Sequence, residues 1–322
     1  MRKTLVAMML AMAAWGTTHG QEFPTQPIRM VIPYAPGGGS DILSRPVAQE
    51  MQDKLKQAVI VDNRGGAGGN IGAQIVARAA PDGYTLLVAN NSHTINPFIY
   101  KEPGYDMAAD FAPISLLATA PAILVVPDAS PARTMHDLIA LAKKKPGSLN
   151  FGSPGVGTPG HLASVLFNKQ AGLDATHIAY KGTGPTTVAV LGGELDYAFL
   201  TPAAVEPHMK SGKLRALAVT SRARFPAFPT VPTVAESRLP ELSNFEVEIW
   251  WGVLAPAKTD PKVLDKLHAS ITEAVRDPKM QQRWTAQGMV PRATTRAEFA
   301  ALIKSDLAKY QKVVRENGIT AE

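Results

Sequence analysis

Short runs of β-branched and aliphatic residues alternate with longer amphipathic segments along most of this chain. The runs at 28–33, 59–62 and 85–89 predict strands, and the segments 41–55 and 71–80 between them predict helices. A second series of predicted strands lies near 122–126, 149–152, 177–180, 197–200 and 215–219. This alternation is typical of an α/β protein with largely parallel sheets.

The last part of the chain adds one predicted strand, at 245–255, and two amphipathic helices whose apolar stripes run through 263–275 and 299–314. Before it, the proline-rich stretch 225–240 fits neither a continuous helix nor a central strand. We interpret this stretch as an extended connection between two lobes.

The domain organisation follows from where the chain crosses between these lobes. If it crosses near 117–121 and returns near Asn244, lobe 1 consists of residues 21–120 and 245–322. Lobe 2 then consists of residues 121–244, and a cleft separates the two lobes. The 322 residues suffice for two domains of ordinary size.

The N-terminus has the pattern of a signal peptide. Arg2 and Lys3 precede a mostly apolar run at 4–15, and the small residues Thr18 and Gly20 suit a cleavage after Gly20. The apolar run is shorter than the roughly 20 residues that span a bilayer. We therefore expect residues 1–20 to be removed and the mature protein to be periplasmic.

Composition excludes several classes of function. Hydrophobic residues at 45% and charged residues at 19% indicate a globular protein. Cysteine is absent, so the chain has no disulfide, thiolate nucleophile or zinc–thiolate site. Removal of the signal peptide leaves 31 basic against 27 acidic residues, and the triplet 143–145 ends a predicted helix, where cations are favoured. We expect no nucleic-acid partner.

The most informative feature is a glycine-rich turn that recurs between a strand and a helix, at 33–41, 150–161 and 180–187. Glycine lets a ligand approach the backbone, and the free N–H groups of a first helical turn favour an anion. A tight turn without a ligand is the alternative for each loop, and a fourth turn at 63–72 fits loop packing better. The candidate ligand-binding residues in the three loops are Tyr34, Ala35, Gly37, Gly38, Gly39, Ser40, Asp41, Ser153, Gly157, Thr158, His161, Lys181, Gly182, Thr183, Gly184, Pro185 and Thr186.

Several polar candidates have a structural alternative. His161 suits a ligand contact or a structural role at a helix start, and Lys181 suits a carboxylate contact or solvent exposure. Asp196 suits a ligand hydroxyl or amine, or the capping of a turn. Side chains that could set specificity at the far end of the cleft are Asn90, Asn91, Ser92, Thr201, Trp250 and Trp251.

Enzyme signatures are weak. Gly155, Gly157 and Gly160 match a dinucleotide fingerprint, but the next predicted strand ends at Lys181 instead of an acidic residue. The sequence contains no GxxxxGK(S/T) phosphate loop and no GxSxG turn, and its histidines lack paired metal-ligand spacing. We therefore predict no catalytic residue, no cofactor and no metal site.

Several motifs resemble one protein family. They are PYAPGGGSD at 33–41, GAGGNIG at 66–72, PDGYTLL at 81–87, YKGTGP at 180–185, GKLRALA at 212–218 and NGI at 317–319. Together they resemble the Bug family, the TctC-like substrate-binding proteins of tripartite tricarboxylate transporters. The family often has Phe where this chain has Tyr34, a difference that adds a hydroxyl near the first loop.

The resemblance implies a two-lobed periplasmic binding protein of the Venus-flytrap kind, type II-like, with a ligand cleft between lobes. It implies a small carboxylate held by the loops 35–41 and 182–187, with 153–161 alongside, mainly through backbone N–H groups and ordered water. It also implies delivery to integral-membrane permease subunits, and a free monomer suits such a shuttling carrier. A binding protein that reports to a membrane sensor and an exported enzyme are the two alternatives.

Overall fold

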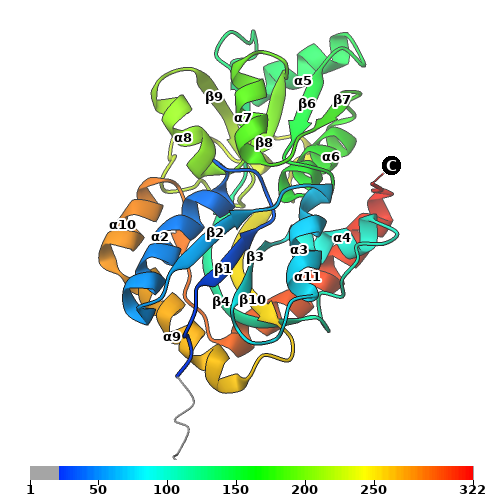
Figure 1. Cartoon of the computed structure of the whole chain (residues 1–322). Coiled ribbons are helices and arrows are strands. Elements are labelled where there is room, and N and C mark those ends of the chain that lie inside the picture. Colours follow the sequence, from blue (N-terminus) through cyan, green and yellow to red (C-terminus); the bar gives the residue numbers. More distant parts are fainter. Residues whose placement is uncertain (1–21, 322) are drawn as a thin grey trace, which may run out of the picture.

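The computed structural model describes residues 22–321 as two lobes stacked one above the other (Figure 1). The predicted signal peptide, residues 1–20, lies outside the described residues. Each lobe contains one β-sheet with helices packed on it. The α/β class and the two-lobed architecture predicted from the sequence are confirmed.

The sheet of lobe 1 has six strands in the order β11-β4-β10-β3-β1-β2. Parallel strands β1, β2 and β3 supply its N-terminal half, and antiparallel β10 inserts between β3 and β4. The strands are β1 (Ile28–Ile32), β2 (Val59–Asn63), β3 (Thr85–Asn90), β4 (Phe111–Pro121), β10 (Glu248–Pro256) and β11 (Val290–Pro291).

Helices cover both faces of this sheet (Figure 1). They are α2 (Gly39–Leu55), α3 (Asn70–Ala77), α4 (Ser92–Ile99), α9 (Pro261–Arg276), α10 (Pro278–Ala286) and α11 (Arg296–Asn317). The C-terminal helix α11 begins with a reciprocal capping box between Thr295 and Glu298 and ends on Gly318, whose φ of 60° is left-handed. The last helices therefore return to the lobe in which the chain began.

The sheet of lobe 2 has five strands in the order β7-β6-β8-β5-β9. Its strands are β5 (Ile123–Pro127), β6 (Asn150–Ser153), β7 (Thr176–Ala179), β8 (Tyr197–Leu200) and β9 (Leu214–Val219). Its helices are α5 (Met135–Lys144), α6 (Pro159–Ala171), α7 (Thr183–Leu191) and α8 (Pro202–Lys210). Helices α6 and α7 both begin directly after a glycine-rich turn that follows a strand.

The expectation of largely parallel sheets is wrong. Strand β5 pairs antiparallel with β8 and β9, and β10 pairs antiparallel with β3 and β4. The reason lies in the path of the chain: β5 enters lobe 2 from lobe 1, and β10 returns in the opposite direction. Periodicity along the sequence identifies such strands but not their direction in the sheet.

The two crossings between the lobes lie side by side at Thr220. Only Ala122 separates β4 from β5, and its N–H donates to the Thr220 hydroxyl at 2.8 Å. The same hydroxyl donates to the carbonyl of Val247, and the Val247 N–H donates to the Thr220 carbonyl at 3.0 Å. One buried threonine thus ties the outgoing and returning chains together.

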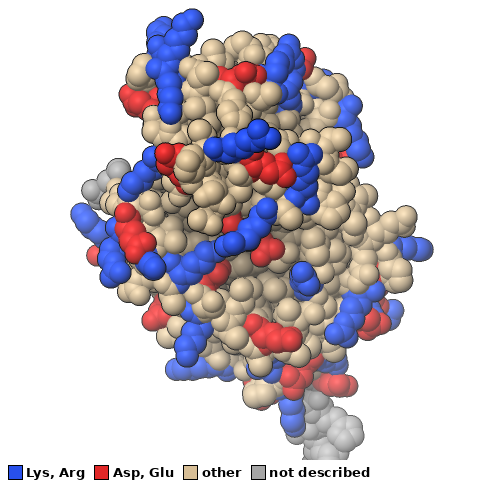
Figure 2. Space-filling model, turned by 180° about the vertical axis from the view of Figure 1, so that it is seen from behind, with Lys and Arg blue, Asp and Glu red and all other residues tan. Residues whose placement is uncertain are grey.

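Charged side chains of both signs are interspersed over the face seen in Figure 2, where both lobes carry Lys and Arg beside Asp and Glu. Ion pairs of the protein include Arg222–Glu246 and Arg224–Glu236. Within residues 22–321 no helix is long and apolar enough to cross a membrane. The same residues contain no group of three or more His, Asp or Glu side chains arranged to hold a metal ion.

Candidate functional site

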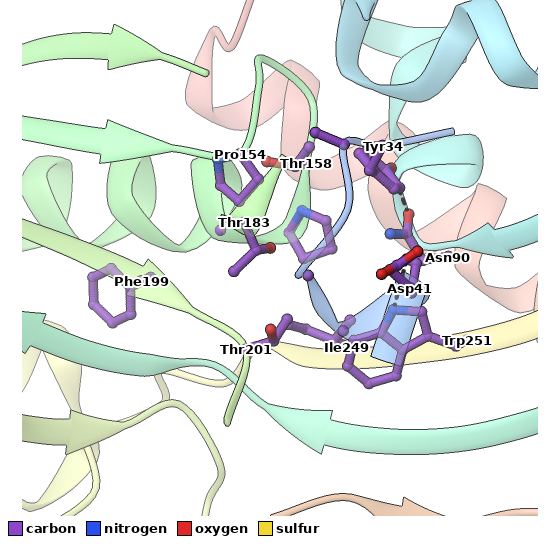
Figure 3. Close-up of a pocket in the computed structure, with 16 residues that line it drawn as sticks. Tyr34, Asp41, Asn90, Pro154, Thr158, Thr183, Phe199, Thr201, Ile249 and Trp251 are labelled. Carbon is purple, nitrogen blue, oxygen red and sulfur yellow. Dashed lines mark hydrogen bonds between the residues drawn. The ribbon is translucent and has the colours of Figure 1, made fainter. Parts of the chain in front are cut away.

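A cavity lies between the two lobes, where the glycine-rich turns meet (Figure 3). Its volume is about 30 Å³, room for roughly two water-sized spheres, so its walls approach one another closely. The lining residues are Tyr34, Ala35, Gly38, Gly39, Ser40, Asp41, Asn90, Pro154, Thr158, Pro159, Gly160, Thr183, Phe199, Thr201, Ile249 and Trp251. Asp41 is the only residue with a formal charge among them.

The first wall is the N-terminus of α2. Gly38 is its N-cap residue, and among the described residues no hydrogen-bond acceptor faces the backbone N–H groups of Gly38, Gly39 and Ser40. Gly39 has no room for a side chain, because a Cβ there would lie 2.8 Å from Cζ2 of Trp251 and 3.3 Å from Oγ1 of Thr201. The missing Cβ therefore leaves free donors directly beside the cavity.

Asp41 holds this turn in shape. One carboxylate oxygen accepts from the Gly37 N–H at 3.1 Å and from Arg45 Nε at 3.0 Å. The other accepts from Arg45 Nη2 at 2.8 Å and from Asn63 Nδ2 at 3.1 Å. Burial opposes ionisation of this carboxyl, but the bonds from Arg45, Gly37 and Asn63 outweigh it and lower its pKa. Asp41 is therefore an ionised group with all four acceptor positions in use.

The second wall comes from lobe 2, where α6 and α7 begin. Thr158 caps α6, its hydroxyl accepting from the His161 N–H and donating to the Gly155 carbonyl. Among the described residues, the N–H groups of Gly160 in α6 and of Thr183 in α7 have no acceptor. Three helix N-termini, one from lobe 1 and two from lobe 2, thus direct unpaired donors and positive dipole ends at one cavity.

Tyr34 and Asn90 form a polar end of the cavity. The Tyr34 hydroxyl donates, and its partners lie at 2.7 Å (Ser92 Oγ), 3.0 Å (Asn90 Oδ1) and 3.3 Å (Gly68 carbonyl). Burial raises the pKa of this hydroxyl well above its usual range, so it stays protonated. Because Asn90 Oδ1 also accepts from the Ser92 N–H, its amide nitrogen is the atom turned toward the cavity (Figure 3).

The apolar part of the wall consists of Phe199, Ile249 and Trp251. In Figure 3, Phe199 lies on the side away from Tyr34 and Asn90, and Trp251 lies below Asn90. The Trp251 indole N–H donates to Ser40 Oγ at 3.1 Å. This bond uses Ser40 Oγ as an acceptor and leaves its hydroxyl hydrogen free to donate. The Thr201 hydroxyl lies in the same region, is buried, and has no hydrogen-bond partner among the described residues.

The loops of the two lobes also touch directly around the cavity. A Cβ on Gly184 would lie 2.3 Å from the Pro36 carbonyl oxygen, so α7 can approach the first turn only with glycine at that position. Hydrogen bonds between the lobes join the Ala35 N–H to the Lys181 carbonyl (2.9 Å), the Tyr100 hydroxyl to the Val156 carbonyl (3.1 Å) and the Lys169 ammonium to the Asn317 carbonyl (3.1 Å). The structure is therefore a closed form.

The structure brings nine of the sequence candidates to the cavity wall. They are Tyr34, Ala35, Gly38, Gly39, Ser40, Asp41, Asn90, Thr158 and Thr183. The others line no part of it: Gly37, Ser153, Gly157, His161, Lys181, Gly182, Gly184, Pro185, Thr186 and Asp196. Most of these support the loops from behind or join the lobes.

His161 is an example of such support. Its Nδ1 accepts from the Gly157 N–H at 3.4 Å, and its ring lies 4.6 Å from that of His177, which hydrogen-bonds Ser153 Oγ at 2.7 Å. Burial, with a smaller contribution from His177, lowers the pKa of His161 to about 3, so the ring is neutral. Neutral Nδ1 is what the Gly157 N–H requires as an acceptor.

Asp196 and Lys181 lie away from the cavity. Asp196 Oδ2 accepts from the Asn150 N–H at 2.6 Å and so ties β6 to the turn before β8. The Lys181 side chain is exposed at a separate hollow that also includes Gly66–Gly69, while its carbonyl joins the lobes.

Seven residues of the cavity wall are not among the ligand-binding residues that the sequence predicts: Pro154, Pro159, Gly160, Phe199, Thr201, Ile249 and Trp251. Pro154, Pro159 and Gly160 lie within the second glycine-rich turn, so their motif was recognised. Thr201 and Trp251 are two of the six residues named as possible specificity determinants at the far end of the cleft. No sequence feature distinguishes them from Asn91, Ser92 and Trp250, which line no part of the cavity. Phe199 and Ile249 read as ordinary strand residues.

The fold defines a two-lobed periplasmic binding protein, a solute-binding protein with a cavity between its lobes. The family model described as "Tripartite tricarboxylate transporter family receptor" matches residues 43–319. The chain belongs to this family, to which its Bug and TctC-like relatives also belong.

Relatives and solved structures agree with this assignment. Protein BugT of Bordetella pertussis is 37% identical over 298 residues, 92% of this chain and 90% of that protein. The structure of periplasmic binding protein BugD has a TM-score of 0.89 at 33% identity and covers 92% of this chain and 99% of its own. MatC from Rhodopseudomonas palustris with bound malate has a TM-score of 0.86 at 29% identity, and the match covers 91% of this chain and 100% of that chain. A second R. palustris structure, with adipate, has a TM-score of 0.88 at 30% identity, and the match covers 93% of this chain and 99% of that chain.

Proposed function

We propose that this protein captures a small carboxylate between its lobes and delivers it to the membrane permease of a tripartite tricarboxylate transporter. The observation that carries the proposal is the convergence of three helix N-termini on one cavity. Their unpaired N–H groups are donors, and a carboxylate supplies acceptors and the matching negative charge. The malate and adipate held by the two related structures are carboxylates of this kind.

Each of the nine sequence candidates on the cavity wall has a role in this proposal. Gly38, Gly39 and Ser40 donate from lobe 1, Thr183 donates from lobe 2, and Asn90 donates through its amide nitrogen. Asp41 and Thr158 fix the turns, and Tyr34 and Ala35 shape the wall. Gly160 adds a donor that the sequence candidates did not include.

Closure of the lobes is the proposed mechanism. A ligand that receives hydrogen bonds from both lobes binds the closed form better than the open form, so binding shifts the population toward closure. The lobe boundaries that we propose are 21–120 with 245–322 and 121–244, because Thr220 ties the two crossings there. The permease then recognises the closed surface, and the protein itself breaks and forms no covalent bond.

We also propose that the protein reaches the periplasm by export with a cleaved signal peptide. Residues 1–20 act as a signal peptide that is removed near Gly20, and the mature carrier works as a monomer. Periplasmic binding proteins such as BugD supply the family context for this location.

A thermal-shift and calorimetric screen of the chain from residue 21 tests carboxylate binding. At about 100 times its dissociation constant, a bound acid adds roughly 2.7 kcal/mol to the free energy of unfolding. The informative variant is Gly39→Ala, because its methyl group would collide with Trp251 beside the free N–H groups. We expect it to weaken binding at least about a hundredfold while the protein still folds.

Gly192→Ala is the matched control for this variant. Gly192 lies at the end of α7 with a φ of −78°, and the nearest atom to an added Cβ is at 3.4 Å. Its affinity should equal that of the wild type. Unchanged affinity in Gly39→Ala, or no thermal shift with any carboxylate, would contradict the proposed site.

A further inference from the structure

We infer that the cavity selects acids whose α-carbon carries a hydrogen or a hydroxyl over the corresponding α-amino acids, and that Thr201 contacts this α-substituent. This inference rests on the proposed carboxylate function and names the ligand class within it. It follows from an inventory of the donors and acceptors that line the cavity.

The cavity wall is rich in donors. Backbone N–H groups come from Gly39, Ser40, Gly160 and Thr183, and none has a partner among residues 22–321. The Asn90 amide nitrogen adds two donor hydrogens. A carboxylate satisfies such a set, whereas an ammonium group is a donor itself and meets three positive helix ends.

The one charged acceptor on the wall is already in use, and so are several of its neutral side-chain oxygens. Asp41, the single carboxylate, receives four hydrogen bonds from Arg45, Gly37 and Asn63, which is its full capacity. Side-chain oxygens of three further wall residues also accept from protein donors: Ser40 from Trp251, Asn90 from Tyr34 and Ser92, and Thr158 from His161. An α-ammonium group therefore enters without a carboxylate to pair with, and an unpaired buried charge is strongly destabilising.

Two buried threonines of the wall, Thr201 and Thr183, are exceptions, because no hydrogen bond joins either hydroxyl to the described residues. Thr201 is 7% exposed, and its Oγ1 is itself buried. This oxygen lies 3.3 Å from the position that a Cβ of Gly39 would occupy, next to the first free N–H groups of α2. In Figure 3 it stands apart from Tyr34 and Asn90, at the end of the cavity that Ile249 also lines.

The location of Thr201 fixes which part of the ligand it meets. A carboxylate held by the Gly39 and Ser40 N–H groups carries its α-carbon about one bond further into the cavity. The neighbouring Thr201 hydroxyl is then within reach of an α-hydroxyl, with which it can both donate and accept. One hydroxyl cannot balance the charge of an ammonium group, so the same position tolerates hydrogen or hydroxyl but not an amine.

Four matched trios of acids test the inference by calorimetry on the chain from residue 21. They are propionate, lactate and alanine; succinate, malate and aspartate; glutarate, 2-hydroxyglutarate and glutamate; and 3-phenylpropionate, 3-phenyllactate and phenylalanine. In every trio that binds, we expect the hydroxy acid to bind at least about tenfold more tightly than the amino acid. An amino acid that binds as tightly as its hydroxy counterpart overturns the inference and leaves the proposed carboxylate function intact.

Variants of Thr201 test the residue itself. Thr201→Val keeps the shape and removes the hydroxyl, so the dissociation constant of the hydroxy acid should rise about three- to tenfold while that of the unsubstituted acid stays within about twofold. Thr201→Ser keeps the hydroxyl and should preserve the preference. Thr272→Val is the control, a buried threonine of α9 outside the cavity, and should change neither constant.

The outcomes separate the two proposals. Equal losses for the hydroxy and unsubstituted acids in Thr201→Val would mean that Thr201 only shapes the wall, which overturns its assigned contact. Failure of all twelve compounds to bind would contradict the proposed carboxylate function, and with it the inference.

Discussion

Lobe 1 and lobe 2 present helix N-termini to the same cavity, but they fix these N-termini by different chemistry. In lobe 1 an ionised carboxylate, Asp41, bridges the Gly37 N–H, Arg45 and Asn63. In lobe 2 a neutral imidazole, His161, accepts from the Gly157 N–H, and the Thr158 hydroxyl caps α6. The comparison teaches that either an ion pair or a neutral ring can hold in place the backbone N–H groups that the proposed carboxylate site needs.

The difference has a consequence for pH. The ionised form of Asp41 is favoured in the folded protein, and so is the neutral form of His161. Protonation of either side chain therefore lowers the stability of its lobe, but the two losses occur over different pH ranges. For His161 the range begins at its ordinary value of 6.5 and extends down to about 3, and for Asp41 it begins only near 3.8.

The largest effect should come from closing the space behind the lobe 2 turn. A Cβ on Gly160 would lie 2.5 Å from the backbone carbonyl oxygen of Phe199, which cannot move aside as a side chain can. Gly160→Ala should lower the free energy of unfolding by about 3 kcal/mol, measured by urea denaturation. In lobe 1, Gly39→Ala meets only side chains, those of Trp251 and Thr201, and should lose affinity far more than stability. Equal stability losses in the two variants would remove this contrast.

His161→Asn should flatten the acid response that we assign to lobe 2. Because the folded pKa of about 3 is below the unfolded 6.5, His161 contributes full stability above pH 6.5 and loses it as the pH falls toward 3. Between pH 7.5 and 5 this loss amounts to about 2 kcal/mol for one histidine. Urea denaturation at both pH values should show a smaller difference for the variant than for the wild type. An unchanged difference would show that His161 does not carry this response.

Asp41→Asn tests the charged support in lobe 1. We expect a loss of about 1–2 kcal/mol in the free energy of unfolding at pH 7, reduced because Arg45 is half exposed. Since the folded pKa is lowered, the contribution is present above the unfolded value of 3.8 and disappears as the pH falls through the folded value. The two proteins should thus converge in stability in strong acid, as measured by denaturation across pH 2–7. A gap that does not narrow as the pH falls from 7 to 2 would assign the loss to packing instead of charge.

The smallest effect should come from the rim, away from both turns. The Lys169 ammonium donates to the Asn317 carbonyl between the lobes, and Lys169 is exposed. Lys169→Met should raise the dissociation constant of a bound acid about twofold at most, because exposed polar contacts contribute a few tenths of a kcal/mol. Calorimetry with the tightest acid of the screen measures this change. A tenfold loss would mean that closure depends on the rim more than on the turns.

Much of the fold was predictable from local patterns. The bounds of the predicted strands 28–33, 85–89 and 197–200 agree with those of β1, β3 and β8 to within one residue. The reason is that buried strands consist of runs of β-branched and aliphatic residues, which the sequence shows directly. The missed elements have weaker local signals: β4 contains Pro113 and Pro121, and α4 contains Pro97. Their conformations depend on pairing with β10 and packing against α11, which are distant in sequence.

The candidate site was predictable to the level of loops but not of all side chains. The glycine-rich turns pointed to Gly38–Asp41 and to the starts of α6 and α7, since a strand–glycine–helix pattern is a local feature. The same reasoning could not separate Trp251 from Trp250. Successive residues of a strand point to opposite faces, and Trp250 packs on Phe299 while Trp251 reaches Ser40 at the cavity.

The sequence by itself determined the α/β class, the three anion-favouring turns and the absence of thiol chemistry, because each is written in neighbouring residues or in composition. Only the tertiary structure decided that these turns meet at one cavity, that Asp41 has no acceptor position left, and that the Thr201 hydroxyl has no partner there. The physical reason is that hydrogen-bond satisfaction is a property of the whole environment of an atom. In this protein that environment comes from two lobes and from strands more than a hundred residues apart in sequence, such as β3 and β10.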